Sequence, residues 1–237
     1  MLRKGLGFIL LFTISCSCQQ GGSRFGEIKP LSQLCVERLE SNRFPLDVSD
    51  IKKDSGGVTL RYQFMSESCL CTSSPVLECG DNWTLTVNGK LAEHLGGSFS
   101  LGGLVHEGEN VIELCGNGEI EPVSICGDFD VLPWDRGGWY LTSAKVLGLG
   151  SVAEQGLPFY AGELSYARQF EVPEKVGRRI LRVTRWDGPV CEIWVNGDKA
   201  VSSTRKTIRK NIGPYLKPGP NDIEVRCRGL YQEYTIK

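Results

Sequence analysis

Hydrophobic and polar residues alternate in two well-separated segments, 83–90 and 192–199, and each segment contains an Asn-Gly pair. Alternation with a period of two predicts a half-buried β-strand. The Asn-Gly pair supplies the positive-φ residues that a tight hairpin turn needs. No segment shows a sustained helical period with caps at its ends. The pattern therefore predicts an all-β protein built as a sandwich.

The two segments belong to a longer internal repeat. Each copy has a first strand, the strand with the Asn-Gly turn, and a Gly-x-Asn turn that leads into a third strand. The first copy covers 58–64, 83–90 and 108–114, and the second covers 164–170, 192–199 and 219–225. A repeat of this length predicts two similar domains rather than a solenoid of short units. We expect a first β-sandwich at 34–132 and a second at 133–237.

The N-terminus has the features of an export signal. Arg3 and Lys4 precede an apolar run at 5–14, which is too short to span a bilayer as a helix. The run ends in Thr13-Ile14-Ser15-Cys16, which resembles a bacterial lipobox except that Thr13 stands where Leu is preferred. We predict a lipoprotein-type signal peptide at 1–16, with Cys16 as the site of lipid attachment.

Two alternatives to this anchor remain open, namely acylation at Cys18 and an ordinary cleaved signal peptide. Residues 17–33 include Gln19-Gln20-Gly21-Gly22-Ser23 and are expected to form a flexible tether. The expected location is the bacterial cell envelope, periplasmic or surface-exposed, with the membrane contacted through the lipid.

Export affects how the ten cysteines are interpreted, eight of which follow Cys18. An even number in an oxidising compartment favours disulfides. Only two histidines are present, which argues against a metal site, and no cofactor is expected. Cys191 and Cys227 each lie on the hydrophobic side of a predicted strand, so they could form a disulfide if the strands are neighbours. The alternative is that several cysteines are buried free thiols.

The balance of charge argues against nucleic-acid binding. The net charge is −1, from 27 basic and 28 acidic residues, and no basic stripe is present. The basic run at 205–210 is interpreted as the solvated face of a strand or loop.

Three blocks carry a resemblance to a known family: 155–170, which contains Gln-Gly-Leu-Pro-Phe-Tyr, then 191–197 and 215–225. In this order they resemble the sugar-binding, galactose-binding-like jelly roll of glycoside hydrolase family 2-type enzymes and of large rhamnosidase-like bacterial glycosidases. Segment 119–131 is similar to a strand and Gly-Asp-Phe turn of the same enzymes, so the resemblance covers roughly 40–230. It implies two jelly-roll β-sandwich domains. The catalytic barrel of such enzymes needs about 250 residues, for which this chain has no room.

The resemblance implies a non-catalytic carbohydrate-binding or accessory module of an exported glycan-degrading system. Sugar sites pair an aromatic ring with polar partners, and binding residues tend to lie in loops. We therefore select Trp134, Trp139, Trp186 and Asp187 as candidate carbohydrate-binding residues. Trp83 and Trp194 lie within predicted strands, where packing is the more common role.

Catalysis is the first alternative. A glycosidase needs two facing carboxylates, but nothing singles out a pair among Asp128, Asp130, Asp135 and Asp187, so we predict no catalytic residue. The chain could instead be part of a larger or split glycosidase whose barrel lies on another chain. The second alternative is a bracing domain that binds no sugar, which exposed apolar surface would favour.

Overall fold

The computed structural model describes residues 11–16, 29–55, 57–70, 74–79, 82–117, 121–174, 177–184, 186 and 188–229. These residues form β-strands and two short 3-10 helices, so the prediction of an all-β protein is confirmed. The chain divides into two compact units. Unit 1 comprises residues 1–40, 146–151 and 161–237, and unit 2 comprises residues 41–145 and 152–160.

The unit boundary differs from the predicted division after residue 132. Strand β14 (Phe129–Pro133) pairs in register with β15 (Trp139–Ser143), and β15 in turn pairs with β6 (Gly57–Ser66). Because this hairpin spans the predicted boundary and is bonded to unit 2, residues 133–145 stay with the first sandwich.

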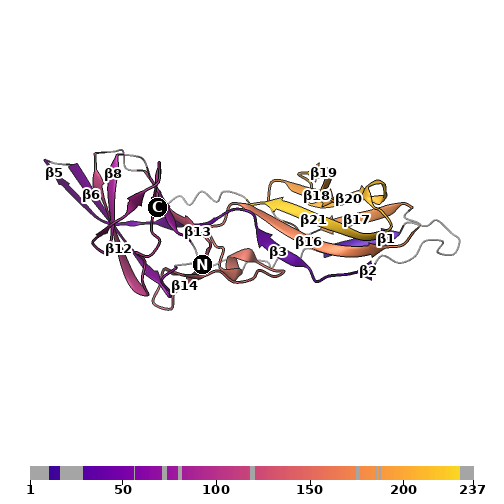
Figure 1. Cartoon of the computed structure of the whole chain (residues 1–237), viewed down its shortest axis with the longest axis horizontal. Coiled ribbons are helices and arrows are strands. Elements are labelled where there is room, and N and C mark those ends of the chain that lie inside the picture. The colour runs from indigo at the N-terminus through magenta and orange to yellow at the C-terminus, as the bar shows by residue number, and fades with distance from the viewer. Residues whose placement is uncertain are drawn as a thin grey trace. The chain divides into compact units, whose positions relative to one another are not determined.

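Unit 2 contains two sheets (Figure 1). One sheet has the order β10-β11-β7-β13-β4, and the other has the order β14-β15-β6-β12-β8-β9, with β5 also paired to β6. The remaining bounds are β4 Asn42–Leu46, β5 Val48–Asp54, β7 Val76–Glu78, β8 Trp83–Val87, β9 Lys90–Leu91, β10 Glu93–His94, β11 Ser98–Ser100, β12 Gly108–Gly116 and β13 Val123–Gly127, with the 3-10 helix η1 at Val152–Gln155.

A single hydrophobic core joins the two sheets of unit 2. Leu77 and Ile125 come from the shorter sheet and Leu85 and Ile112 from the longer one, and all four are fully buried. Inward-facing residues alternate with outward-facing ones along β8 and β12, as the period of two predicts. Unit 2 is therefore a sandwich of two sheets around one core.

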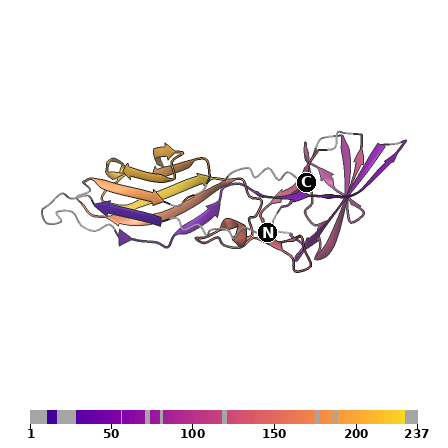
Figure 2. The same ribbon diagram turned by 180° about the vertical axis from the view of Figure 1, so that it is seen from behind.

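Unit 1 also contains two sheets, which appear as stacked layers in Figures 1 and 2. One has the order β1-β17-β20, and the other has the order β19-β18-β21-β16-β2, with β3 also paired to β16. The bounds are β1 Leu11–Cys16, β2 Lys29–Pro30, β3 Cys35–Arg38, β16 Glu163–Val172, β17 Arg179–Thr184, β18 Cys191–Val195, β19 Asp198–Ser203, β20 Thr207–Asn211 and β21 Gly219–Arg228, with the 3-10 helix η2 at Gly213–Tyr215.

Strand β1 includes part of the predicted export signal. Its backbone pairs antiparallel with β17, from Leu11 opposite Thr184 to Cys16 opposite Arg179. Residues 1–10 and 17–28, including Cys18, lie outside the described residues. The described part of the chain holds no helix with the length and apolarity of a membrane span. The signal peptide and the tether stay predictions.

The predicted repeat appears as a repeated strand order. In unit 2 the copy gives the order β6-β12-β8-β9, and in unit 1 it gives β16-β21-β18-β19. Both Asn-Gly turns have positive φ at both residues, 53° and 76° at Asn88 and Gly89, and 52° and 86° at Asn196 and Gly197. These values are those of the type I′ hairpin turn that the sequence predicts.

Each unit has one buried asparagine that holds its Asn-Gly turn, and the hydrogen bonds are the same in both units. In unit 1, Asn221 is 1% exposed, and its Oδ1 accepts from Asn196 Nδ2 at 2.8 Å and from the Lys217 amide at 2.9 Å. Its Nδ2 donates to the carbonyls of Lys217 and Gly219 at 2.7 and 2.8 Å. Asn221 thus fixes the Gly-x-Asn turn to the Asn-Gly turn.

Asn110 of unit 2 repeats this arrangement and is fully buried. Its Oδ1 accepts from Asn88 Nδ2 at 2.9 Å and from the His106 amide at 3.0 Å. Its Nδ2 donates to the carbonyls of His106 and Gly108 at 2.8 and 3.1 Å. The repeat seen in the sequence therefore extends to individual hydrogen bonds.

Candidate carbohydrate-binding surfaces

The first candidate surface is the hairpin between β14 and β15, which carries Trp134 and Trp139. The Trp134 amide donates to the Gly138 carbonyl at 3.0 Å, and the Gly137 amide donates to the Trp134 carbonyl at 2.9 Å. Gly137 and Gly138 have φ values of 90° and 85°, which residues with a side chain rarely adopt. The glycines therefore close the hairpin tip and hold both tryptophans on it.

The two indoles of this hairpin differ in surroundings. Trp139 is 38% exposed, and its ring packs edge-on against the Phe159 ring with centroids 5.1 Å apart. Phe159 in turn contacts the Phe44 ring at 5.9 Å, which anchors the set in unit 2. Trp134 is half-buried, and the Arg136 guanidinium lies 5.6 Å from its ring centroid. Trp139 is therefore an exposed ring held in place by a second ring.

Segment 152–160 supplies Phe159 and packs within unit 2. The Val131 amide donates to the Gly156 carbonyl at 2.8 Å, and Asn42 Nδ2 donates to the same carbonyl at 3.2 Å. Gly156 has a φ of 94°, and a Cβ at this position would collide with the side chain of Asp130. The Gln-Gly-Leu-Pro-Phe-Tyr block therefore supports the Trp139 hairpin.

Trp186 does not form an open platform. Its side chain is only 4% exposed, and its Nε1 donates to the Arg205 carbonyl at 3.2 Å. The Lys206 ammonium lies 4.9 Å from its ring centroid, so residues 205 and 206 cover the ring. The prediction that Trp186 offers a face to sugar does not fit this burial. Asp187, its predicted partner, lies outside the described residues.

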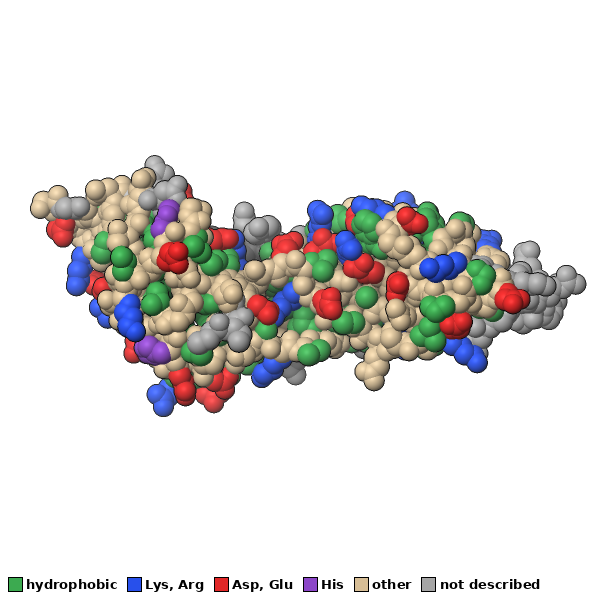
Figure 3. Space-filling view, in the orientation of Figure 1, with side chains coloured by type: hydrophobic (Ala, Val, Ile, Leu, Met, Phe, Trp, Pro, Cys, Tyr) green, Lys and Arg blue, Asp and Glu red, His purple; other side chains and the backbone are tan. Residues whose placement is uncertain are grey.

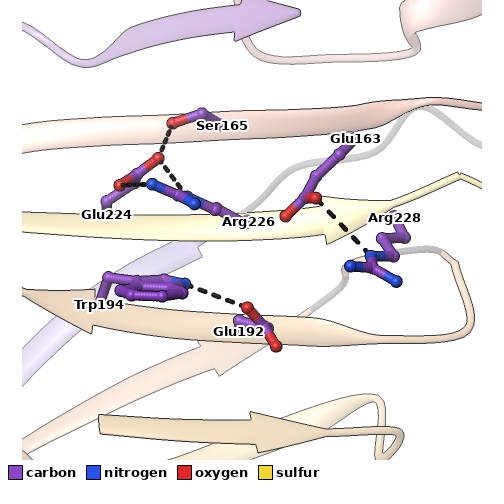
Figure 4. Close-up of polar contacts among 7 residues, drawn as sticks. All are labelled: Glu163, Ser165, Glu192, Trp194, Glu224, Arg226 and Arg228. Atoms are coloured by element: carbon purple, nitrogen blue, oxygen red, sulfur yellow. Dashed lines mark hydrogen bonds and ion pairs between the residues drawn. The ribbon is translucent and has the colours of Figure 1, made fainter. Parts of the chain in front are cut away.

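The second candidate surface was not selected from the sequence. It is the outer face of β16, β21 and β18, and we define it as the polar face (Figure 4). Outward-pointing side chains of these three strands are linked there by hydrogen bonds and ion pairs. The polar face comprises Glu163, Ser165, Glu192, Trp194, Glu224, Arg226 and Arg228.

The centre of the polar face is a chain of short contacts. Ser165 Oγ donates to Glu224 Oε1 at 2.6 Å, and Arg226 Nε donates to the same oxygen at 2.7 Å. Arg226 also donates from Nη2 to Glu224 Oε2 at 3.0 Å. This two-pronged pairing fixes both side chains, so the groups are held before any ligand arrives.

Trp194 stands beside this pair with its own contacts satisfied. Its Nε1 donates to Glu192 Oε2 at 3.2 Å. The Arg226 guanidinium lies 4.6 Å from the ring centroid and the Lys199 ammonium lies 5.0 Å from it. Lys199 also bonds Glu192 at 2.8 Å. Cations from both neighbouring strands thus approach the indole, and a stacking sugar would have to displace one of them.

The electrostatics of the polar face keep Glu192 and Glu224 ionised. The hydrogen bond from Lys199 is the main cause that lowers the pKa of Glu192. Burial by itself would raise the pKa of Glu224, but hydrogen bonds from Arg226 and Ser165, together with the charge of Arg226, bring it below the ordinary value. A glycosidase acid needs the opposite shift, so neither group is suited to donate a proton.

The sequence contained the signal for Trp194. Cys191, Ile193 and Val195 face the core and are fully buried, so residues 192 and 194 must face outward by strand alternation. The prediction that a tryptophan within a strand packs inside holds for Trp83, which is 9% exposed. For Trp194 the periodicity of its own strand is the better guide.

Cys191 and Cys227 lie directly opposite each other on β18 and β21. Both are free thiols, and Cys227 Sγ donates to Cys191 Sγ at 3.5 Å. The neighbour relation on which the predicted disulfide depended is therefore present, while the bond itself is not formed in this structure. Cys69 is disulfide-bonded, whereas Cys35, Cys115 and Cys126 are free thiols.

Metal binding and charge clustering have little support in the described residues. Among them, no group of three or more His, Cys, Asp or Glu side chains is placed to hold a metal ion. Acidic and basic side chains are interspersed over the face of the molecule seen in Figure 3. Asp130 is only 1% exposed and accepts from the Lys145 amide at 2.9 Å, which is a structural role.

Comparisons with known proteins give low similarities. No protein-family model and no curated protein matches the chain. Among solved structures, a Streptomyces avermitilis alpha-L-rhamnosidase complexed with L-rhamnose is 13% identical with a TM-score of 0.31, covering 81% of this chain and 24% of that one. A rhamnosidase from Novosphingobium sp. PP1Y is 15% identical with a TM-score of 0.30, covering 83% and 22%.

A beta-D-glucuronidase from Dictyoglomus thermophilum is 14% identical with a TM-score of 0.28, covering 89% of this chain and 45% of that chain. The chain thus spans a quarter or less of the two rhamnosidases and under half of the glucuronidase. All three neighbours are glycoside hydrolases.

Proposed function

We propose that this protein is a non-catalytic carbohydrate-binding or accessory β-sandwich module of an exported glycan-degrading system. The single observation that carries the proposal is Trp139, a 38% exposed indole whose edge is fixed by Phe159. A sugar presents a flat face of C–H groups, which stacks on such a ring. The sequence resemblance to sugar-binding jelly rolls supports the same reading.

The expected affinity is weak. One stacked ring contributes on the order of 1 kcal/mol beyond its buried area, so a shallow site should bind in the high micromolar to millimolar range, roughly −4 to −6 kcal/mol. Trp134 and Asp135 lie on the same hairpin and offer further contacts for sugar hydroxyls. The Arg136 side chain already stacks on Trp134, which leaves Trp139 as the more accessible ring.

The test is a glycan-array screen, followed by calorimetric titration of any polysaccharide that binds. Trp139→Ala should abolish binding while its circular dichroism matches the wild type. Trp194→Ala is the matched control, because it removes an indole from the polar face and leaves the hairpin intact. If Trp139→Ala binds like the wild type and Trp194→Ala does not, the platform is the polar face. Loss in neither variant would overturn both assignments.

A bracing role is the second candidate, and exposed apolar side chains favour it. Leu91 is 70% exposed and Leu95 is 49% exposed, on either side of β10 in unit 2. A bracing module would cover such residues with a partner domain, here a glycosidase barrel on another chain. Co-purification with a barrel protein that Leu91→Asp disrupts, without any glycan binding by the wild type, would favour this role.

Catalysis is the third candidate and has the least support. Measurable turnover of an aryl glycoside by the wild type, lost when one carboxylate is changed, would overturn the non-catalytic proposal. Such activity could also arise from a complex with a barrel chain, so the purified single chain is the sample to assay.

We also propose export with lipid attachment at Cys16. Cleavage before Cys16 would remove residues 11–15 from their place beside β17. A multiply acylated cysteine anchors firmly, unlike a single acyl chain. Cys16→Ser should therefore move the protein from the membrane fraction to the soluble fraction, with Cys18→Ser as the control. If only Cys18→Ser releases the protein, the acceptor is Cys18.

A further inference from the structure

We propose that Cys191 and Cys227 form a disulfide between β18 and β21 when the chain folds in an oxidising compartment. The two residues are paired in register, and their sulfur atoms are 3.5 Å apart. A disulfide requires about 2.05 Å, so the sulfurs need to approach by only about 1.5 Å. This inference is independent of the proposed function.

The hydrogen-bond pattern of the sheet favours the bond at this position. The amide of Arg228 donates to the carbonyl of Val190 at 3.0 Å, which makes residues 190 and 228 a hydrogen-bonded pair. The next pair inward, Cys191 and Cys227, is therefore a non-hydrogen-bonded pair. In such pairs the Cα atoms lie closest, about 4.5 Å apart, which is within the range that a disulfide can bridge.

The surroundings determine when the bond forms. Cys191 is fully buried and Cys227 is 6% exposed. The hydrogen bond from Cys227, then burial, raises the pKa of Cys191, and burial raises the pKa of the adjacent Tyr166 to about 12. Thiolates, which carry out exchange, are therefore scarce in the folded unit. The disulfide therefore forms during folding, before both thiols are buried, and burial then shields the bond from reductants.

The chemistry is an exchange with a small disulfide such as glutathione disulfide. One protein thiolate attacks the reagent and releases one reduced thiol, and the second protein thiolate then displaces the other. The protein loses two electrons and two protons and gains one S–S bond. The reagent accepts both electrons and both protons as its S–S bond breaks.

Three other described thiols have neighbours of a different kind. Cys35 Sγ donates to Glu37 at 3.3 Å, and Cys115 Sγ lies 3.5 Å from Thr59 Oγ1. Cys126 is buried beside Glu78 and Arg43, and its pKa is raised to about 11 mainly by burial. Cys126 is therefore a matched control, a buried thiol that lies beside Glu78 and Arg43.

The experiment is oxidative refolding of the full chain in glutathione disulfide, with a parallel sample refolded in dithiothreitol. Alkylation and non-reduced peptide mapping follow. Cleavage after glutamate is required, because trypsin would leave Cys227 in a two-residue peptide, whereas cleavage after Glu gives 175–192 and 225–233. We expect these two peptides to be joined in the oxidised sample alone.

A second measurement, of Tm, tests the same bond without peptide mapping. The cross-link closes a loop between positions 36 residues apart, so the oxidised Tm should exceed the reduced Tm by about 10 °C. The variant Cys191→Val/Cys227→Val should lose this difference, and Cys126→Ala should keep it. Alkylated thiols at both positions after oxidative refolding, or a bond from Cys227 to another cysteine, would overturn the proposal.

Discussion

The buried asparagine of unit 1 allows a quantitative test of the repeated turn network. We consider Asn221→Ala. This change removes four hydrogen bonds of 2.7–2.9 Å, two that Oδ1 accepts and two that Nδ2 donates. Each contributes about 1 kcal/mol net, and a partner left unsatisfied in a buried position costs about 1–3 kcal/mol. Lys217 is exposed, so water can replace its two bonds in part.

The sum is a loss of about 3 kcal/mol in the free energy of unfolding of unit 1. For a unit of this size the Tm should fall by about 10 °C. The assay is urea unfolding followed by circular dichroism, with hydrogen exchange of proteolytic peptides to assign the change to unit 1. Because the effect arises at the two turns, peptides covering residues 196–222 should lose protection first.

Two variants provide the comparison. Asn110→Ala removes the equivalent bonds from unit 2 and should destabilise that unit by a similar amount. Asp222→Ala changes the adjacent exposed residue, whose side chain accepts one bond from Gln169, and should cost under about 0.5 kcal/mol. A loss below about 1 kcal/mol in Asn221→Ala would refute the reasoning, because the bonds would then not be holding the turn.

The remaining predictions concern the turn at Gly156, the Trp194 indole and two glutamates of the polar face. Gly156→Ala should destabilise unit 2 by about 2–4 kcal/mol, because Gly156 has a φ of 94° and an added Cβ would collide with Asp130. Thermal unfolding measures the loss, and a change under about 1 kcal/mol would contradict the prediction. Trp194→Phe should lower the free energy of unfolding by about 1 kcal/mol, because it loses the hydrogen bond to Glu192 and weakens the cation–π contacts. Urea unfolding measures this loss. Trp186→Phe is the comparison and should cost more, because that ring is buried. Glu224 and Glu192 have lowered pKa values, so they stabilise the fold above the ordinary glutamate pKa and lose this contribution as pH falls through the lowered values. Unit 1 should therefore lose stability in acid. Glu224→Gln should be less stable than the wild type at neutral pH but less sensitive to acid. A Glu224→Gln variant with the wild-type pH profile would contradict the last prediction.

Much of the fold followed from alternation and turn residues, because both act locally. The segment 192–199 needed only its own sequence to be read as a strand and a type I′ turn, and the structure has both. The opposition of Cys191 and Cys227 depended on two strands being neighbours, a condition that the sequence left open and the structure meets. The strand and its turn require few long-range contacts to form.

The candidate sites depended on tertiary packing, which local patterns do not report. Trp186 was expected in a loop with a free face, but the chain at 205–206 returns over its ring. The block around Phe159 falls within the second sandwich predicted at 133–237, yet Gly156 and Phe159 pack within unit 2. Trp139 kept its expected exposure, since a hairpin tip closed by two glycines has few neighbours to cover it.

The division of the chain also bears on the order in which the protein is made. Unit 2 has all its residues once position 160 has been synthesised, whereas unit 1 needs residues from both sides of it. In particular, Ser32 accepts hydrogen bonds from Arg168 and Gln169 of β16, which are synthesised 136 and 137 residues after it. All of unit 2 is therefore synthesised while the N-terminal strands of unit 1 still lack their partner strands. A chain truncated after residue 160 should hold a folded unit 2. A gene cut between the repeats would leave unit 1 without β2 and β3, which pair with β16.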